Sequence, residues 1–303
     1  MDGQPVPDDE SIAFELAAVA AVTAGVAASV AAVLGLAFAA YAAGATGTVF
    51  GSELAARLRR VRWAPMRPAL RKVAADARDL GVRRAGPPYP PEVDEPDLPD
   101  PDRAVADALQ DAARLAQLLP MTTKRDLQSV QGRANQGVAR ARGHARWVAN
   151  EGINAGVAAV ARERGERLIW VAERNACLHC LAHAGYAVEP GDSFPIVSYD
   201  PIRPDAMPAV LWPPLHPNCR CAVRTYSGPA GRPPSNRSLA VPAARLAAEA
   251  RRSVVYQWTD YASGVRARAA ASRLLDIGAS LPDSVERRAR RALRADSRVK
   301  RPT

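Results

Sequence analysis

The 303-residue chain contains four cysteines, and their clustering restricts the possible folds more than any other feature of the sequence. Cys177 and Cys180 form a C-x-x-C pair, and Cys219 and Cys221 follow His216 in an H-x-x-C-x-C pattern. A two-residue spacer lets two thiolates turn inward on one tight loop, and two such pairs complete a tetrahedron around zinc. The spacing therefore predicts that two loops far apart in the sequence meet at one structural zinc ion.

The fourth ligand of this predicted site has two candidates. The first three ligands are expected to be Cys177, Cys180 and Cys219, because these cysteines lie in the two knuckles at spacings typical of zinc ligands. The fourth ligand is either Cys221 or His216, and we favour Cys221.

Other uses of the cysteines agree less well with the sequence. A redox-active C-x-x-C normally starts a helix beside a strand-helix-strand pattern, and no such pattern precedes Cys177. Two disulfides would suit an exported chain, but no cleavable signal peptide is visible. A catalytic zinc needs an open position and a nearby base, and the deaminase pattern H-x-E with P-C-x-x-C is missing.

His179 and His183 are expected at the surface or in packing contacts rather than as ligands.

The residues around the cysteines carry a family resemblance. An E-R-N-A-C-x-x-C-x-x-x-x-G turn follows Trp170, an F-P pair stands at Phe194, and a P-P-L-H-P-N-C-R-C run ends at Cys221. This arrangement resembles the phage Mu F-like family, also known as phage minor head or head morphogenesis proteins, in the form found in actinobacterial phages and prophages. The signature covers about a fifth of the chain.

The resemblance implies a minor capsid protein of the virion head, present in a few copies and associated with the portal and the packaged double-stranded DNA. It implies assembly in the cytoplasm of the bacterial host and no established catalytic residues. The sequence contains neither H-E-x-x-H nor G-x-S-x-G. We therefore expect a structural protein without a small-molecule substrate, and not an enzyme.

The charge of the chain favours an anionic partner. The formal net charge is +10, and residues 238–303 hold fourteen Lys and Arg against six Asp and Glu. A last helix is expected after Pro282, with Asp283 and Glu286 as a capping pair. This helix and the tail after it are expected to contact the backbone of duplex DNA; the alternative is that the basic residues are simply solvated. The eight basic residues are Arg287, Arg288, Arg290, Arg291, Arg294, Arg298, Lys300 and Arg301.

An uncharged stretch at 16–51 is long enough to span a membrane. Its valines recur every three or four residues, which is typical of a helix that packs against a partner. We favour a buried or partner-bound helix, and the alternative is a span in the host inner membrane that anchors a cytoplasmic zinc module. The basic flank that follows would then face the cytoplasm; otherwise it is solvated or contacts phosphate. The stripe comprises Val19, Val22, Val26, Val30 and Val33, and the flank Arg57, Arg59, Arg60 and Arg62.

The composition predicts a mainly α fold with a small α+β zinc-knuckle-like module and extended helical arms at both ends. Aromatic residues make up only 5% of the chain and alanine is abundant, so small residues should dominate a thin core. A stretch rich in proline and acidic residues predicts a semi-rigid linker and a domain boundary. The expected regions are a disordered lead at 1–10, a helical region at 11–84, the linker at 85–102, a helical region at 103–168, the Cys/His module at 169–227 and a basic helical region at 238–303.

Local signals predict the ends of several helices and strands. Ser11 and Ser52 are the predicted N-caps of the first two helices. A third helix is expected from Ala69 to Leu80, with Gly81 as its stop. Further predicted elements are helices at 123–142 and 143–164, and paired strands at 168–171 and 221–226.

Overall fold

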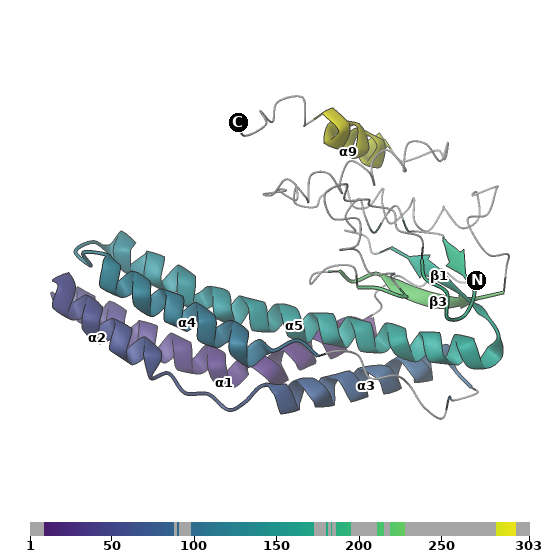
Figure 1. Cartoon of the computed structure of the whole chain (residues 1–303), viewed down its shortest axis with the longest axis horizontal. Helices are drawn as coiled ribbons and strands as arrows, with labels where there is room; N and C mark the ends of the chain where they lie inside the picture. Colours follow the sequence, from purple (N-terminus) through teal and green to yellow (C-terminus); the bar gives the residue numbers. More distant parts are fainter. Residues whose placement is uncertain are drawn as a thin grey trace. The chain divides into compact units, whose positions relative to one another are not determined.

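The structure is a computed structural model that describes residues 9–87, 90, 98–172, 180, 183, 186–194, 211–214, 219–227 and 283–294. These residues form a mainly helical protein with one small three-stranded antiparallel sheet (Figure 1). The expected mainly α fold with a small sheet is therefore confirmed. Most of the predicted lead, half of the predicted linker, and the predicted helices between residues 238 and 282 lie outside the described residues.

The elements follow one another in chain order, and Figure 1 labels most of them. The helices are α1 (Asp9–Ala42), α2 (Gly47–Arg59), α3 (Arg67–Ala85), α4 (Pro101–Leu118), α5 (Lys124–Arg164) and α9 (Asp283–Arg294). The strands are β1 (Arg167–Val171), β2 (Ala187–Val188) and β3 (Ala222–Tyr226).

The contacts divide the chain into two compact units, and neither is a continuous stretch of sequence. The first, called the knuckle unit, comprises Met1–Ile12, Ala77–Asp94 and Asn150–Thr303. The second, called the helical unit, comprises Ala13–Asp76 and Glu95–Ala149. The helical unit thus contains helices from both sides of the predicted linker, because these helices share one core.

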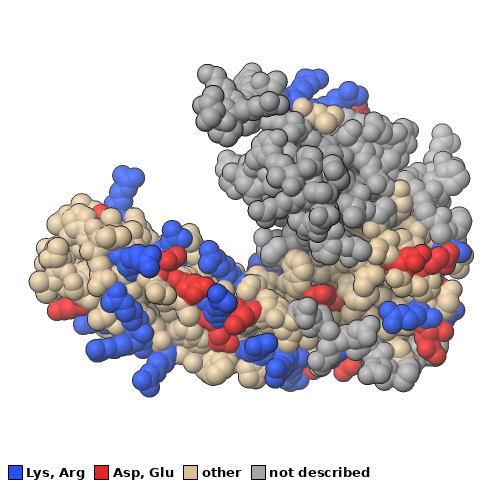
Figure 2. Space-filling view, viewed as in Figure 1, with Lys and Arg blue, Asp and Glu red and all other residues tan. Residues whose placement is uncertain are grey.

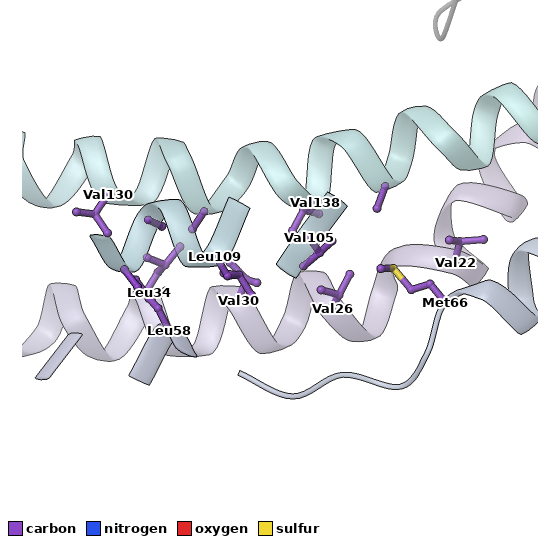
Figure 3. Packing of buried hydrophobic residues seen from close by; sticks show 14 of the residues in the cluster. Val22, Val26, Val30, Leu34, Leu58, Met66, Val105, Leu109, Val130 and Val138 are labelled. Carbon is purple, nitrogen blue, oxygen red and sulfur yellow. The ribbon is translucent and has the colours of Figure 1, made fainter. Parts of the chain in front are cut away.

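The core of the helical unit is built from one face each of α1, α2, α4 and α5, together with the first half of α3. Val22, Val26 and Val30 of α1 are at most 4% exposed, and they point toward side chains of the neighbouring helices (Figure 3). Val19 and Val33 pack at the edges of the same stripe. The predicted valine stripe is therefore confirmed, and it packs within its own chain.

The opposite face of α1 is apolar as well. Leu16 and Leu36 are 56% and 59% exposed, and no charged residue occurs between Glu15 and Glu53. By length and composition α1 could cross a membrane, although a core helix of a soluble protein meets the same criteria. Packing within the unit therefore explains why the inner face of α1 is apolar, but it does not explain why the exposed outer face is apolar.

Small residues let the helices of this unit approach closely. A Cβ added to Gly137 of α5 would lie 2.8 Å from the Cβ of Ala108 and 3.1 Å from the Cα of Val105. Ala112 and Ala113 of α4 are fully buried. Alanine is the most frequent residue of this core, beside valine and leucine, so small residues contribute much of it, as the composition predicts.

The starts of the first two helices differ from the prediction. α1 begins before Ser11, whose hydroxyl accepts a hydrogen bond from the guanidinium of Arg84 instead of capping the helix. α2 begins before Ser52, at Gly47, which has a φ of 84° and donates its N–H to the carbonyl of Met121 over 3.2 Å. Contacts between distant segments therefore decide where both helices start.

The predicted stop at Gly81 is wrong. α3 continues through this residue to Ala85. A Cβ on Gly81 would overlap the carbonyl oxygen of Ile153 in α5. The glycine is required for a close helix contact, not for a helix end.

The two helices predicted at 123–142 and 143–164 form one helix, α5. Gly143 lies inside it. Each glycine costs a helix roughly 1 kcal/mol relative to alanine. Burial of the neighbouring Ala141 and Ala145 in the core outweighs this cost, so the helix continues.

Asp102, in the first turn of α4, holds the segment that leads into α3. Its carboxylate accepts hydrogen bonds from the Trp63 indole Nε1 at 3.0 Å, from the Met66 backbone N–H at 3.0 and 3.1 Å, and from the Arg67 backbone N–H at 3.2 Å. One side chain thus satisfies three donors, including backbone donors at the start of α3.

We expect Asp102→Ala to lower the free energy of unfolding by about 2 kcal/mol, because hydrogen bonds to a charged group are lost. The matched control is Asp107→Ala, which removes an exposed i,i+4 pair with Arg103 at 3.9 Å and should cost no more than about 0.5 kcal/mol. Urea unfolding measures both. Equal effects of the two substitutions would contradict the role assigned to Asp102.

We expect His144 of α5 to make the stability of the chain pH-dependent. Burial lowers the pKa of His144 below 6.5; Asp100 opposes this shift and Arg140 adds to it. The unfolded chain therefore binds a proton at this site more readily, so the free energy of unfolding should fall as the pH drops below 6.5. In unfolding curves above and below pH 6.5, His144→Gln should reduce this decline; an unchanged decline would contradict the prediction.

The sheet has the strand order β2-β1-β3, and both pairings are antiparallel. Trp170 of β1 lies opposite Val223 of β3. The strands predicted at 168–171 and 221–226 are confirmed within one residue, as is their pairing. Because β3 starts directly after Cys221, this pairing brings the second knuckle to the sheet.

Candidate metal centre

Three of the four cysteines meet in the knuckle unit. Cys180 precedes β2, whereas Cys219 and Cys221 directly precede β3. The three Sγ atoms lie within 4.8 Å of one another, and those of Cys180 and Cys219 are 3.6 Å apart. The three residues are 1%, 4% and 1% exposed. Three buried thiols in this arrangement could hold a metal ion.

The spacing of the sulfurs fits a shared metal better than a disulfide. The sulfurs of a disulfide are about 2.0 Å apart. Two thiolates bound to a tetrahedral metal at about 2.3 Å have sulfurs about 3.8 Å apart. The 3.6 Å between Cys180 and Cys219 is close to the second value. No disulfide therefore joins the three cysteines that the structure describes.

The remaining two predicted ligands, Cys177 and His216, lie outside the described residues. Each stands three residues before a cysteine of the cluster, Cys177 before Cys180 and His216 before Cys219. Cys221, favoured over His216 from the sequence, belongs to the cluster. Ligation by Cys177 or His216 stays a prediction.

An aromatic cluster joins β1 to the segment between the knuckles. Trp170 is 1% exposed, and its ring centroid lies 5.2 Å from that of Phe194 in an edge-to-face arrangement and 4.8 Å from that of His183. His183 is therefore a packing residue, as the sequence predicts. This cluster ties the chain between Cys180 and Cys219 to the sheet.

Asn154 of α5 holds the second knuckle through its backbone. The side chain is fully buried, and its Nδ2 donates to the carbonyl oxygens of Cys221 and Pro213, each at 3.3 Å. Its Oδ1 accepts from the Val223 backbone N–H at 2.8 Å. One amide thus positions both ends of the knuckle and the start of β3.

Asn150, one helical turn earlier, extends this contact. Its Nδ2 donates to the carbonyl oxygen of Cys219 at 2.5 Å, and its Oδ1 accepts from Asn154 Nδ2 at 2.5 Å. The sequence reasoning missed both residues. The available signal was two asparagines at i and i+4 in a helical stretch that is apolar apart from Glu151, because asparagine favours neither a helix interior nor burial unless it has partners.

We expect Asn154→Leu to weaken metal binding by about 10- to 100-fold, as changes behind first ligands typically do. The leucine would remove the Nδ2 donor to the carbonyl oxygens of Cys221 and Pro213 and the Oδ1 acceptor of the Val223 N–H. Competition with a chromophoric chelator measures the affinity. The matched control is Asn135→Leu on the exposed face of α5, which should leave it unchanged. Equal affinities for the two variants would contradict the assigned role.

Of the eight C-terminal basic residues predicted to contact DNA, the structure describes the side chains of four, all on α9. α9 starts at Asp283, where the sequence predicts it, and Arg290 pairs with Glu286 at 2.6 Å. Arg287, Arg291 and Arg294 are exposed. The side chain of Arg288 and all of Arg298, Lys300 and Arg301 lie outside the described residues.

No family model, no curated protein and no solved structure matches this chain.

Proposed function

We propose that the chain is a structural minor head protein of a phage or prophage, in which a zinc ion stabilises the knuckle unit and basic residues contact the portal or the packaged DNA. The observation that carries the proposal is the convergence of Cys180 with Cys219 and Cys221, because these knuckles belong to the signature of the resembling family. The role is one of docking and assembly, without chemistry on a substrate.

Zinc is the metal that this donor set favours. Thiolates select zinc, copper(I) or iron–sulfur clusters, and closed sites of four cysteines or three cysteines and a histidine are typical of structural zinc. The near-complete burial of the three thiols supports a closed site. Cys177 or His216 would supply the fourth ligand.

Elemental analysis of the purified chain tests the metal. We expect about one zinc per chain, and its loss in a Cys177→Ser or a His216→Ala variant would identify the fourth ligand. A metal-free chain purified with zinc in all buffers would contradict the zinc part of the proposal.

Co-sedimentation tests the assembly role. The purified chain is mixed with portal rings from the phage that encodes it, and separately with long linear duplex DNA, at two salt concentrations. We expect binding to the portal at both concentrations and salt-sensitive binding to DNA. Binding to neither would contradict the proposal.

A membrane-anchored protein with a cytoplasmic zinc module is the second candidate function. The apolar outer face of α1, with Leu16 and Leu36 more than half exposed, favours it. Fractionation of cells without detergent separates the candidates, because a spanning protein stays in the membrane pellet whereas a head protein is released.

A further inference from the structure

A second group of basic residues, distant in sequence from α9, lies in the helical unit. It covers the end of α2, the loop that follows and the start of α3, and we call it the basic strip. No Asp or Glu occurs between Glu53 and Asp76. The basic strip comprises Arg57, Arg59, Arg60, Arg62, Arg67, Arg71 and Lys72.

All seven side chains of the basic strip are exposed. Lys72 pairs with Asp76 at 2.8 Å, and Arg59 donates to the Gln117 side chain at 2.6 Å. Within the described part of the chain, no hydrogen bond or ion pair is formed by the side chains of the remaining five. These five are Arg57, Arg60, Arg62, Arg67 and Arg71.

The backbone beneath the basic strip is held in place. Two of its segments are helical, and Asp102 binds the loop between them through Trp63, Met66 and Arg67. The guanidinium groups are thus displayed from a preorganised surface, so less backbone entropy is lost when a ligand binds them.

The neighbouring surface has the opposite character. α4 carries Asp102, Asp107 and Asp111 against Arg103 and Arg114. In Figure 2 the blue side chains gather along the edge where α2 and the loop into α3 run in Figure 1, while red ones gather over α4. The basic strip is therefore a surface without acidic residues of its own beside a mixed surface on α4, and exposed arginines of α5 form further positive charge in the same unit.

We propose that the basic strip binds the phosphate backbone of duplex nucleic acid, independently of base sequence. Unpaired arginines on a fixed surface release counterions from the duplex when they bind phosphate, and this release drives association. Arginine also suits phosphate because its planar fork donates two parallel hydrogen bonds.

The apolar content of the basic strip argues against two other ligands, a lipid surface and single-stranded nucleic acid. No large apolar side chain between residues 57 and 72 is among the exposed ones, so nothing inserts into a lipid surface as interfacial segments require. The only aromatic residue, Trp63, is half-buried and donates its indole N–H to Asp102. Stacking on single-stranded bases therefore has no platform here.

This inference rests on the DNA-contact part of the proposed function and deepens it by naming a surface, although it uses neither the cysteines nor the arginines of α9. A chain that bound no portal could still bind duplex through the basic strip, and a chain whose strip bound no duplex could still bind the portal.

The test compares two triple variants of the full chain with equal charge change. Arg57→Gln/Arg60→Gln/Arg62→Gln removes part of the basic strip. Arg125→Gln/Arg133→Gln/Arg142→Gln removes three exposed arginines of α5 in the same unit. Fluorescence anisotropy with a short duplex of arbitrary sequence is recorded between about 50 and 200 mM salt. Thermal unfolding checks that both variants fold, and Arg67→Gln/Arg71→Gln serves as a second strip variant.

The strip variant should lose at least about tenfold in affinity, and the slope of log K against log salt should fall by about 3 for three lost phosphate contacts. The α5 variant should change affinity less than about threefold, since it acts only through net charge. Equal losses in the two variants would overturn the proposal. It would also be overturned if the strip variant kept its duplex affinity but lost binding to phosphatidylglycerol vesicles.

Discussion

Cys219→Ser is expected to abolish tight metal binding and to unfold the knuckle unit under conditions in which the native chain is folded. Structural zinc contributes about 10 to 16 kcal/mol of apparent binding energy in small metal-dependent domains, and the thiol of Cys219 lies 3.6 Å from that of Cys180 in a buried cluster. Zinc content and near-ultraviolet circular dichroism, to which the packed Trp170 contributes, measure the two effects.

A chelator separates loss of metal from loss of packing. The native chain treated with a strong chelator should show the same spectral change as the Cys219→Ser variant, and added zinc should restore only the native chain. Ser227→Ala, an exposed position just after β3, is the control and should change neither property. If the chelator leaves the native spectrum intact, the cysteines stabilise this unit by packing alone.

Gly156→Ala is expected to destabilise the knuckle unit by about 3 kcal/mol, at the upper end of the cost of overpacking. A Cβ at this position of α5 would overlap the carbonyl oxygen of Arg78 and lie 2.8 Å from the backbone N of Val82 in α3. Backbone atoms cannot rotate away as a side chain can. The two helices would have to separate at this crossing.

The same substitution elsewhere in α5 provides the control with the opposite sign. Gly132 has open space around its Cα, so Gly132→Ala should stabilise the helix by roughly 1 kcal/mol through its higher propensity. Thermal and denaturant unfolding of both variants measures the difference. If Gly156→Ala also stabilises the chain, the close crossing of α3 and α5 is not present in solution.

Much of the local structure could be predicted from the sequence. The valine periodicity identified the buried face of α1, the β-branched run before the knuckle identified β1, and Asp283 with Glu286 marked the start of α9. These predictions succeed because spacing along a helix or strand determines which side chains share a face. The helix ends were predicted less well. Ser52 and Gly81 have the right residue types for caps, but distant segments supply stronger contacts.

The sequence by itself determined that two cysteine knuckles should converge and that small residues should dominate the packing of long helices, because residue type and spacing suffice for both conclusions. Only the tertiary structure decided that Asn150 and Asn154 hold the second knuckle and that glycines of α3 and α5 lie at a helix crossing. The physical reason is that a buried amide or a missing side chain acquires its role from a partner distant in the chain, and no local pattern names that partner.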